Sequence, residues 1–412
     1  MEAQILAKLS DFDKRALLSI YEHRCLNEDM LYKYVYLEKD VHRSYTTRRV
    51  NRLEELNLIE QIDYNNEFPA LFLTNTGIRV VRMAYPREIA ALTKTEGKLL
   101  TASDLRIGSV NINHQMHLNQ FALETCSMMQ GVPHKYFDEK YMPVASQYMM
   151  ADGMIELENR VLFLETDMGT ERSGRLAQKW ESYRSFLKDK GAYYQNKRIE
   201  MYFILEGLKN PMQRILTVSK SVLSYLADYI GKDFEIYINT PDFLRQVILN
   251  SMQKSEISCA RNLRETGFLV SHSNFLDEIN LPNAIYIRKI NEQRKIQIVE
   301  GKAQEYIVEE WSDTRMSVLN TLLSFQKKQA RIKEYAKRKI SYIIVVPSEK
   351  EIVRILKALD MIQPDDLLFT TQNRLEGNEW AAALFRFDQL GNLYHFKDAG
   401  LKELIHERRY VN

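Results

Sequence analysis

The stretch "FLETDMGTERSGRLAQKWESYRSFL", residues 163–187, joins an apolar segment that ends in acidic residues to a segment with helical spacing. Side chains two positions apart on a strand point to the same face of a sheet, so we expect Glu165 and Asp167 on one face. In the following helix, Lys179 and Tyr183 lie one turn apart. A strand that leads into an amphipathic helix predicts an αβ domain with polar groups where the strand ends.

The preceding segments predict a carboxylate cluster. "YMMADGMIELE" and "RVLFLETD" read as two strands joined by a turn at residues 158–159, which sets Asp152 at the height of Glu165. Asp152, Glu165 and Asp167 would then hold Mg²⁺ or Mn²⁺, because these ions prefer oxygen ligands. Such an ion polarises a phosphodiester and generates hydroxide near neutral pH, and Lys179 would stabilise the developing charge. The alternative is a set of strand-end carboxylates that are solvated or form salt bridges.

The order of elements around this stretch predicts a mixed sheet with crossover helices. A helix that begins near His114 precedes the strands "HKYFDE", "YMMADGMIELE" and "RVLFLETD". The helix of Lys179, the apolar strand "RIEMYFILEG", a further helix and the strand "FEIYINT" follow. His114 and His117 are three positions apart and could share a metal ion, but no third ligand is near in sequence, which favours cap or surface roles.

The first ninety residues predict three helices followed by a β-hairpin. "FDKRALLSIYEHRCL", "NEDMLYKYVYL" and the segment from Ser44 each carry an apolar stripe, and "LIEQID" and "ALFLT" flank a polar turn. This order is typical of a winged helix, whose third helix enters the major groove of DNA. The alternative is a charged face on a protein–protein module. The candidate DNA-binding residues are Ser44, Thr46, Thr47, Arg48, Arg49, Asn51 and Arg52.

A second copy of the middle domain is expected at about residues 265–375. "IVEEWSDTRMS" aligns with "FLETDMGTERS", and "KIQIVEGKAQEYIVEE" reads as a hairpin like the one before Asp167. The alternative is chance similarity between two αβ segments. This alignment sets Glu309 on Glu165, Ile296 on Asp152, Trp311 on Asp167 and Leu323 on Lys179. The copy would therefore be a scaffold, a dimerisation unit or a second DNA-contacting surface, to which the basic helix "FQKKQARIKEYAKRK" would contribute.

Composition places the chain among intracellular globular proteins. Apolar residues make up 45% of its 412 residues and charged residues 27%, and the net charge of +2 neither demands nor excludes nucleic acid. No apolar run approaches the roughly 20 residues that span a bilayer, and the N-terminal residues are not typical of a signal peptide. The three cysteines show neither CxxC pairing nor a disulfide pattern. We therefore expect a cytoplasmic protein without a membrane partner or structural zinc.

The acidic and basic positions resemble those of known families. The order Asp, Glu-x-Asp, Lys, Tyr resembles the PD-(D/E)xK nuclease superfamily, with the lysine moved from the strand to the next helix. Combined with an upstream winged helix, it is more similar to the plasmid replication-relaxation protein family. Members typically show "LTxxG", a histidine near a helix start, a "PD…ExDxGT" core and a "K…Y" helix. Here these elements read Leu73-Thr74-Asn75-Thr76-Gly77, His114, Ala151-Asp152, Glu165-Thr166-Asp167-Met168-Gly169-Thr170 and Lys179…Tyr183.

This resemblance covers roughly residues 10–210 and departs from the family at Ala151, where a proline is usual. It implies a role in the replication and relaxation of plasmid or mobile-element DNA. We predict an α+β or α/β multidomain protein with an N-terminal winged helix and two PD-(D/E)xK-like αβ domains, the second degenerate. The predicted domains are residues 1–95 (winged helix), 96–112 (linker), 113–260 (nuclease-like) and 261–412 (second, degenerate copy with a C-terminal hairpin and helix).

The expected function is that of a DNA-binding replication or relaxation factor of a plasmid, phage or integrative element. Its candidate activity is metal-dependent DNA nicking, with Asp152, Glu165, Asp167 and Lys179 as catalytic residues. The expected partners are double-stranded DNA and a second copy of the chain in a homodimer. Two alternatives stay open: a sequence-specific transcription regulator with a catalytically dead nuclease-like scaffold, and a protein–protein adaptor.

Overall fold

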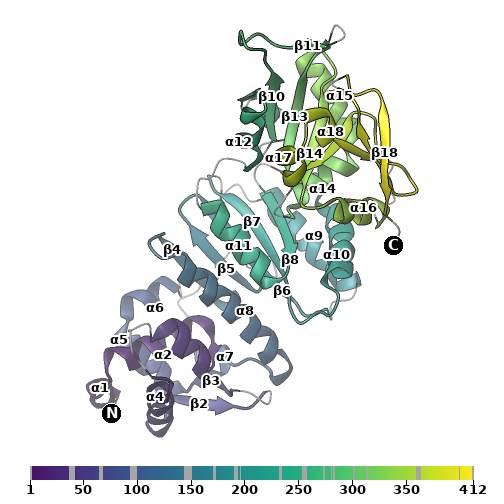
Figure 1. Ribbon diagram of the computed structural model, residues 1–412. Coiled ribbons are helices and arrows are strands. Elements are labelled where there is room, and N and C mark those ends of the chain that lie inside the picture. Colours follow the sequence, from purple (N-terminus) through teal and green to yellow (C-terminus); the bar gives the residue numbers. More distant parts are fainter. Residues whose placement is uncertain are drawn as a thin grey trace. The chain divides into compact units, whose positions relative to one another are not determined.

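The computed structural model divides the chain into two compact units (Figure 1). The first comprises residues 1–211 and 239–249, and the second residues 212–238 and 250–412. Both combine helices with β-sheets, so the predicted α+β multidomain class is confirmed. The finer domain boundaries stay predictions. The structure describes residues 2–36, 42–64, 68–92, 100–142, 151–169, 173–189, 194, 196–231, 234–252, 258–271, 274–279, 281, 284–299, 302–311, 314–358, 363–398 and 400–410.

The N-terminal part of the first unit surrounds a three-stranded antiparallel sheet in the order β1-β3-β2. Its strands are β1 (Cys25–Leu26), β2 (Ile59–Ile62) and β3 (Ala70–Leu73). Its helices are α1 (Glu2–Leu6), α2 (Asp11–His23), α3 (Glu28–Met30), the π-helical η1 (Leu31–Val35), α4 (Arg43–Glu55), α5 (Asn75–Ala84), α6 (Pro86–Leu92) and α7 (Ala102–Leu105). Three helical segments and a β2–β3 hairpin therefore follow one another in the predicted order, and the hairpin turn at residues 65–67 lies outside the described residues.

The "LTNTG" segment fixes the start of α5 against the preceding turn. The Thr74 side chain caps the helix by accepting a hydrogen bond from the backbone N–H of Gly77 at 3.1 Å. A Cβ atom at Gly77 would lie 2.0 Å from the carbonyl oxygen of Leu58, so only glycine fits at this close approach. The segment therefore joins α5 to the sheet of this part of the unit.

A second sheet carries the predicted carboxylates, and its strands within the first unit lie in the order β4-β5-β6-β7. The first two pairings are antiparallel and β6–β7 is parallel, with α9 as the crossover helix. The apolar strand β6 is buried along almost its whole length, as a central strand covered on both faces requires. The elements are α8 (Ser109–Met128), β4 (His134–Asp138), η2 (Glu139–Tyr141), β5 (Gly153–Leu157), β6 (Arg160–Asp167), α9 (Ser173–Asp189), β7 (Arg198–Leu205) and α11 (Pro241–Met252).

The second unit contains an eight-stranded sheet in the order β18-β17-β16-β15-β14-β13-β10-β9. Its strands are β9 (Phe268–Ser271), β10 (Ala284–Lys289), β13 (Glu305–Glu310), β14 (Ser341–Val346), β15 (Leu367–Thr371), β16 (Phe385–Phe387), β17 (Asn392–Phe396) and β18 (Leu404–Arg409), with β8 (Phe234–Asn239) and the short pair β11 (Ile298–Val299) and β12 (Lys302–Ala303) in addition. The helices are α10 (Pro211–Leu226), α12 (Ser258–Glu265), α13 (Asn274–Glu278), α14 (Met316–Leu323), α15 (Phe325–Ala336), α16 (Glu349–Ala358), α17 (Gln372–Gly377) and α18 (Trp380–Ala383).

The predicted C-terminal hairpin is present as β16 and β17, but the predicted closing helix is wrong. Residues 404–409 form β18 instead, because their backbone pairs with β17 at the edge of the sheet. At the hairpin turn Gly391 has φ of +81°, a conformation that favours glycine.

The strand order supports an internal repeat and corrects its alignment. Strands β9-β10-β13-β14 repeat the order and directions of β4-β5-β6-β7. However, the antiparallel partner of β13 is β10, and Ala284 lies opposite Glu309. Ile296 belongs to an insertion between these strands, so its predicted equivalence with Asp152 is wrong and Ala284 takes that place. Because alanine has no carboxylate, the second copy still lacks an acidic residue at the position of Asp152.

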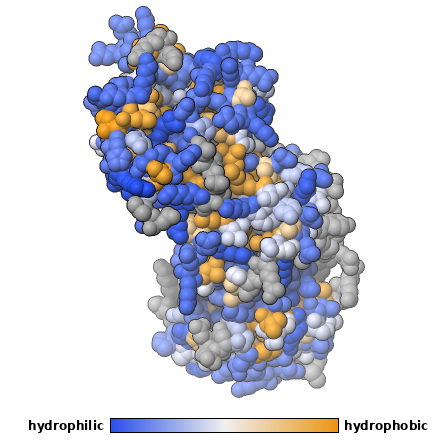
Figure 2. All heavy atoms as spheres, turned by 90° about the vertical axis from the view of Figure 1, so that its right-hand side faces the viewer, coloured by the Kyte–Doolittle hydropathy of each residue, from blue (hydrophilic) through white to orange (hydrophobic). Residues whose placement is uncertain are grey.

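The face drawn in Figure 2 is mostly hydrophilic, with smaller hydrophobic patches between the polar side chains. In the described part of the chain, no helix combines the length and apolar character needed to cross a membrane.

Candidate functional site

Glu165, near the end of β6, is fully buried and is held by two side chains from α9. Its Oε2 lies 2.7 Å from Lys179 Nζ, and its Oε1 accepts a hydrogen bond of 2.6 Å from the Tyr183 hydroxyl. Trp180 fixes the helix on the sheet through a contact with Phe203 of β7, with ring centroids 5.7 Å apart. The one-turn spacing of Lys179 and Tyr183 thus places both donors on the same carboxylate.

Asp152 lies beside Glu165 on the neighbouring strand. Gly153 pairs with Leu164, so the hairpin turns at residues 158–159 and sets Asp152 opposite Glu165, as predicted. The Asp152 carboxylate accepts a hydrogen bond of 2.7 Å from the backbone N–H of Thr166 and lies 3.3 Å from His114 Nε2. The same His114 nitrogen lies 2.9 Å from the Thr166 carbonyl oxygen. One imidazole therefore links α8 to the ends of β5 and β6.

The cluster alternates acidic and basic groups, and each shifts the other's proton affinity. Burial raises the pKa of Glu165 to about 7, although the Lys179 charge and the hydrogen bonds from Lys179 and Tyr183 act to lower it. Burial acts to raise the pKa of Asp152, but the His114 hydrogen bond and charge outweigh it, and this pKa is lowered. Burial alone would lower the pKa of His114, but the bond to Asp152 raises it to about 9. His114 is thus a cation at neutral pH.

Asp167, the third predicted ligand, turns to its own loop. Its side chain is buried, and Oδ1 accepts a hydrogen bond of 2.9 Å from the backbone N–H of Gly169, whose φ is +77°. Among the residues that the structure describes, no group of three or more His, Cys, Asp or Glu side chains could hold a metal ion. The structure brings Asp152, Glu165 and Lys179 together without making a three-carboxylate ligand set. In this arrangement Lys179 and His114 contact the oxygens of Glu165 and Asp152 for which a metal ion would compete.

The sequence pattern did not identify His114 as a member of this cluster. The sequence suggests a possible metal pair with His117, but the side chain of His117 lies near Glu206, with 3.8 Å between its Nδ1 and the Glu206 Oε1. The partner of His114 lies 52 residues away at Thr166, and such a contact leaves no periodic signal in the sequence. The fixed histidine of the family pattern was the one signal that could have found it.

The His114–Asp152 pair predicts a pH dependence of stability. Because the folded-state pKa of His114 is raised from 6.5 to about 9, its contribution is complete below pH 6.5 and is lost as the pH rises through 9. Between these limits we expect wild type to lose about 1–3 kcal/mol more unfolding free energy than His114→Ala. Urea unfolding at several pH values measures this, with His117→Ala as the control on the same helix. Parallel curves for wild type and His114→Ala would contradict the assignment.

Helix α4 contains the predicted DNA-binding residues, and the structure separates them into two groups. Ser44, Arg48, Asn51 and Arg52 are exposed and follow one another at helical spacing on one face. Arg52 also donates a hydrogen bond of 3.0 Å to the Lys8 carbonyl oxygen. The other side of the helix packs on the unit through buried Val50 and Leu53. The exposed group contains arginine and asparagine, the side chains that hydrogen-bond guanine and adenine in the major groove.

The remaining predicted residues of α4 make intramolecular contacts. Thr46 is buried, and the Thr47 hydroxyl donates a hydrogen bond of 2.6 Å to Glu28. Arg49 lies 2.5 Å from the fully buried carboxylate of Asp13 in α2. These three side chains therefore position the helix and are not part of its exposed face.

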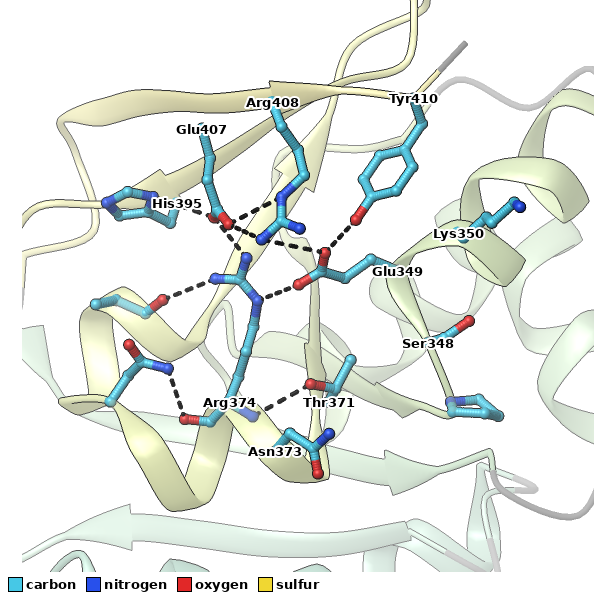
Figure 3. Close-up of a pocket in the computed structure, with 13 residues that line it drawn as sticks. Ser348, Glu349, Lys350, Thr371, Asn373, Arg374, His395, Glu407, Arg408 and Tyr410 are labelled. Atoms are coloured by element: carbon cyan, nitrogen blue, oxygen red, sulfur yellow. Dashed lines mark hydrogen bonds and ion pairs between the residues drawn. The ribbon is translucent and has the colours of Figure 1, made fainter. Parts of the chain in front are cut away.

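The second unit holds a polar pocket at the carboxyl ends of β14 and β15 (Figure 3). Its cavity measures about 590 Å³. Arg374 lies at its centre and pairs with Glu349 and Glu407 at 2.5 Å each, and Arg408 also pairs with Glu407. The two arginines and two glutamates pair with one another, so their charges compensate, and Lys350 also lines the pocket.

Residues 17–200 match the family described as Replication-relaxation, so this part of the chain is similar to that family. The matched range includes α4 and the complete His114–Asp152–Glu165–Lys179 cluster. Neither the search of curated proteins nor the search of solved structures returned a match.

Proposed function

We propose that this protein, whose residues 17–200 match the replication-relaxation family, binds double-stranded DNA through α4 of a winged helix. The family indicates a role in plasmid or mobile-element replication. The observation that carries DNA binding is the division of α4 into a buried face and an exposed face with Ser44, Arg48, Asn51 and Arg52. A helix that follows two others and precedes a hairpin is the one a winged helix inserts into the major groove. Arg48 and Asn51 then read bases, and Ser44 meets the phosphate backbone.

The test is a titration of the full chain with duplex DNA, followed by fluorescence anisotropy. We expect binding whose affinity falls with salt, because lysines and arginines that meet phosphates release counterions. Selection of duplexes from a random pool then identifies the preferred site. A chain that binds no duplex at low salt contradicts the proposal and favours the protein–protein adaptor. Sedimentation of the same sample tests the predicted homodimer.

A second candidate is metal-dependent nicking by the carboxylate cluster. It is favoured by the position of Asp152, whose side chain is 21% exposed beside buried Glu165 and Lys179. Under this proposal Asp152, Glu165 and Asp167 are the acidic groups and Lys179 stabilises charge. It ranks second because Lys179 and His114 compete with any added cation for the same oxygens. We therefore favour a scaffold role for the cluster within a DNA-binding factor.

Supercoiled plasmid with Mg²⁺ or Mn²⁺ distinguishes these two roles of the cluster. We expect the plasmid to stay supercoiled both with wild type and with Glu165→Gln. Nicked plasmid that requires both the metal ion and Glu165 would establish the nicking activity and contradict the scaffold role.

A further inference from the structure

Residues 290–299 and 302–304 of the second unit lie between β10 and β13 along the chain and form a projection from the sheet, here called the knob. Asn291 closes the first turn, where its backbone N–H donates to the Lys295 carbonyl oxygen at 2.9 Å. Gln297 then pairs with Lys289, and Gln304 with Gln297, at 2.8 and 3.1 Å. Figure 1 shows β11, which belongs to this insertion, beyond the ends of β10 and β13. The knob has no counterpart between β5 and β6, which are joined by a tight turn.

The knob combines exposed basic and exposed apolar side chains. Arg294 and Lys295 are exposed at its first turn, with Glu292 as the one exposed acidic residue among its described positions. Ile298 is 66% exposed and Ile296 is 38% exposed. Exposing an isoleucine side chain to water contributes no stability to the fold. Exposed apolar patches that are rimmed by polar residues mark interaction sites.

Helix α15 brings further positive charge to the base of the knob. Arg338, just after the helix, lies 2.6 Å from Glu305, the first residue of β13 and the next residue after the knob. Arg338 and Lys339 are used in ion pairs, the latter with Asp366, whereas Lys337 is exposed at the helix end. Two segments that are far apart in sequence thus place exposed cations at the same end of the sheet.

We propose that the knob and the C-terminal end of α15 form a second DNA-contacting surface. Arg294, Lys295 and Lys337 meet phosphates, and Ile298 enters a groove between them and packs against sugar and base edges. Narrow two-stranded projections of this kind fit the grooves of duplex DNA, and apolar tips pack between base steps. The inference rests on the proposed function, because it adds a DNA contact in the second unit to the one proposed for α4.

The experiment compares two double variants of the full chain on one long duplex over a salt series. Arg294→Ala/Lys295→Ala should lower affinity roughly ten-fold near 100 mM salt and reduce the salt slope by about two, one for each lost phosphate contact. The charge-matched control Arg261→Ala/Lys220→Ala changes two residues of α12 and α10 and should leave the slope unchanged. Ile298→Ser should weaken binding without changing the slope, since no charge is lost.

The outcomes separate this inference from the proposed function. A knob variant that binds like wild type, while Arg48→Ala binds more weakly, overturns the second surface and keeps α4. Equal losses in the knob and control variants also overturn it, because the effect would then be one of net charge. Wild type that binds no duplex removes both proposals. The knob side chains are exposed, so unchanged melting temperatures verify that each variant is folded.

Discussion

Lys179→Met is expected to lower the unfolding free energy of the first unit by about 3–5 kcal/mol. The substitution leaves the fully buried Glu165 without its cation, and removing one partner of a buried pair has costs of this order. The loss should be larger above pH 7 than below it. At low pH Glu165, whose pKa is raised to about 7, takes up a proton and no longer needs the charge of Lys179.

Urea unfolding of the first unit measures this effect, with two comparison variants. Lys188→Met makes the same change at an exposed position of α9 and should alter stability by less than about 0.5 kcal/mol. Glu165→Gln combined with Lys179→Met should recover part of the loss, because the double variant has no buried charge left. Equal effects at Lys179 and Lys188 would show that Glu165 does not depend on this lysine.

Arg49→Ala is expected to destabilise the first unit by about 2–3 kcal/mol. The side chain is 14% exposed and its partner Asp13 is fully buried, so the substitution leaves a buried carboxylate between α2 and α4 without its cation. Asp13 keeps its hydrogen bonds from Ser10, which limits the loss. Arg48→Ala, at the neighbouring exposed position, is the matched control and should leave the melting temperature unchanged. A stable Arg49→Ala protein would contradict the ion pair's structural role.

Local spacing predicted part of the site. The turn at residues 158–159 set the register of β5 and β6, and the one-turn spacing put Lys179 and Tyr183 on one side of α9. These features depend only on the periods of strands and helices, which the order of residues fixes. The pairing of Asp152 with Glu165 followed directly.

Tertiary partners account for what the sequence could not predict. Arg48 and Arg49 are identical in type and adjacent in sequence, and only the packing of α2 decides which of them pairs with Asp13. His114 is similar, since its partners come from β5 and β6. The insertion between β10 and β13 shifted the alignment of the repeat, because sequence similarity followed the inserted hairpin and not the strand that pairs with β13. The edge position of β18 likewise depends on pairing with β17.

The proposed function depends most on the exposed face of α4. The adjacent arginines of α4 can be separated experimentally: exposed Arg48, together with Asn51, should affect DNA binding, and Arg49, which pairs with Asp13, should affect folding. Each base contact contributes about 1–3 kcal/mol, so Arg48→Ala/Asn51→Ala should weaken binding by about 2–6 kcal/mol if both side chains read bases.

The most direct measurement is the dissociation constant of the full chain for a duplex selected from a random pool. It is compared for wild type, Arg48→Ala/Asn51→Ala and a scrambled duplex at one salt concentration. We expect the double variant to lose its preference for the selected duplex, to keep weak salt-dependent binding to both duplexes and to melt at the wild-type temperature. A double variant that is folded and still distinguishes the selected duplex as wild type does would contradict recognition by α4.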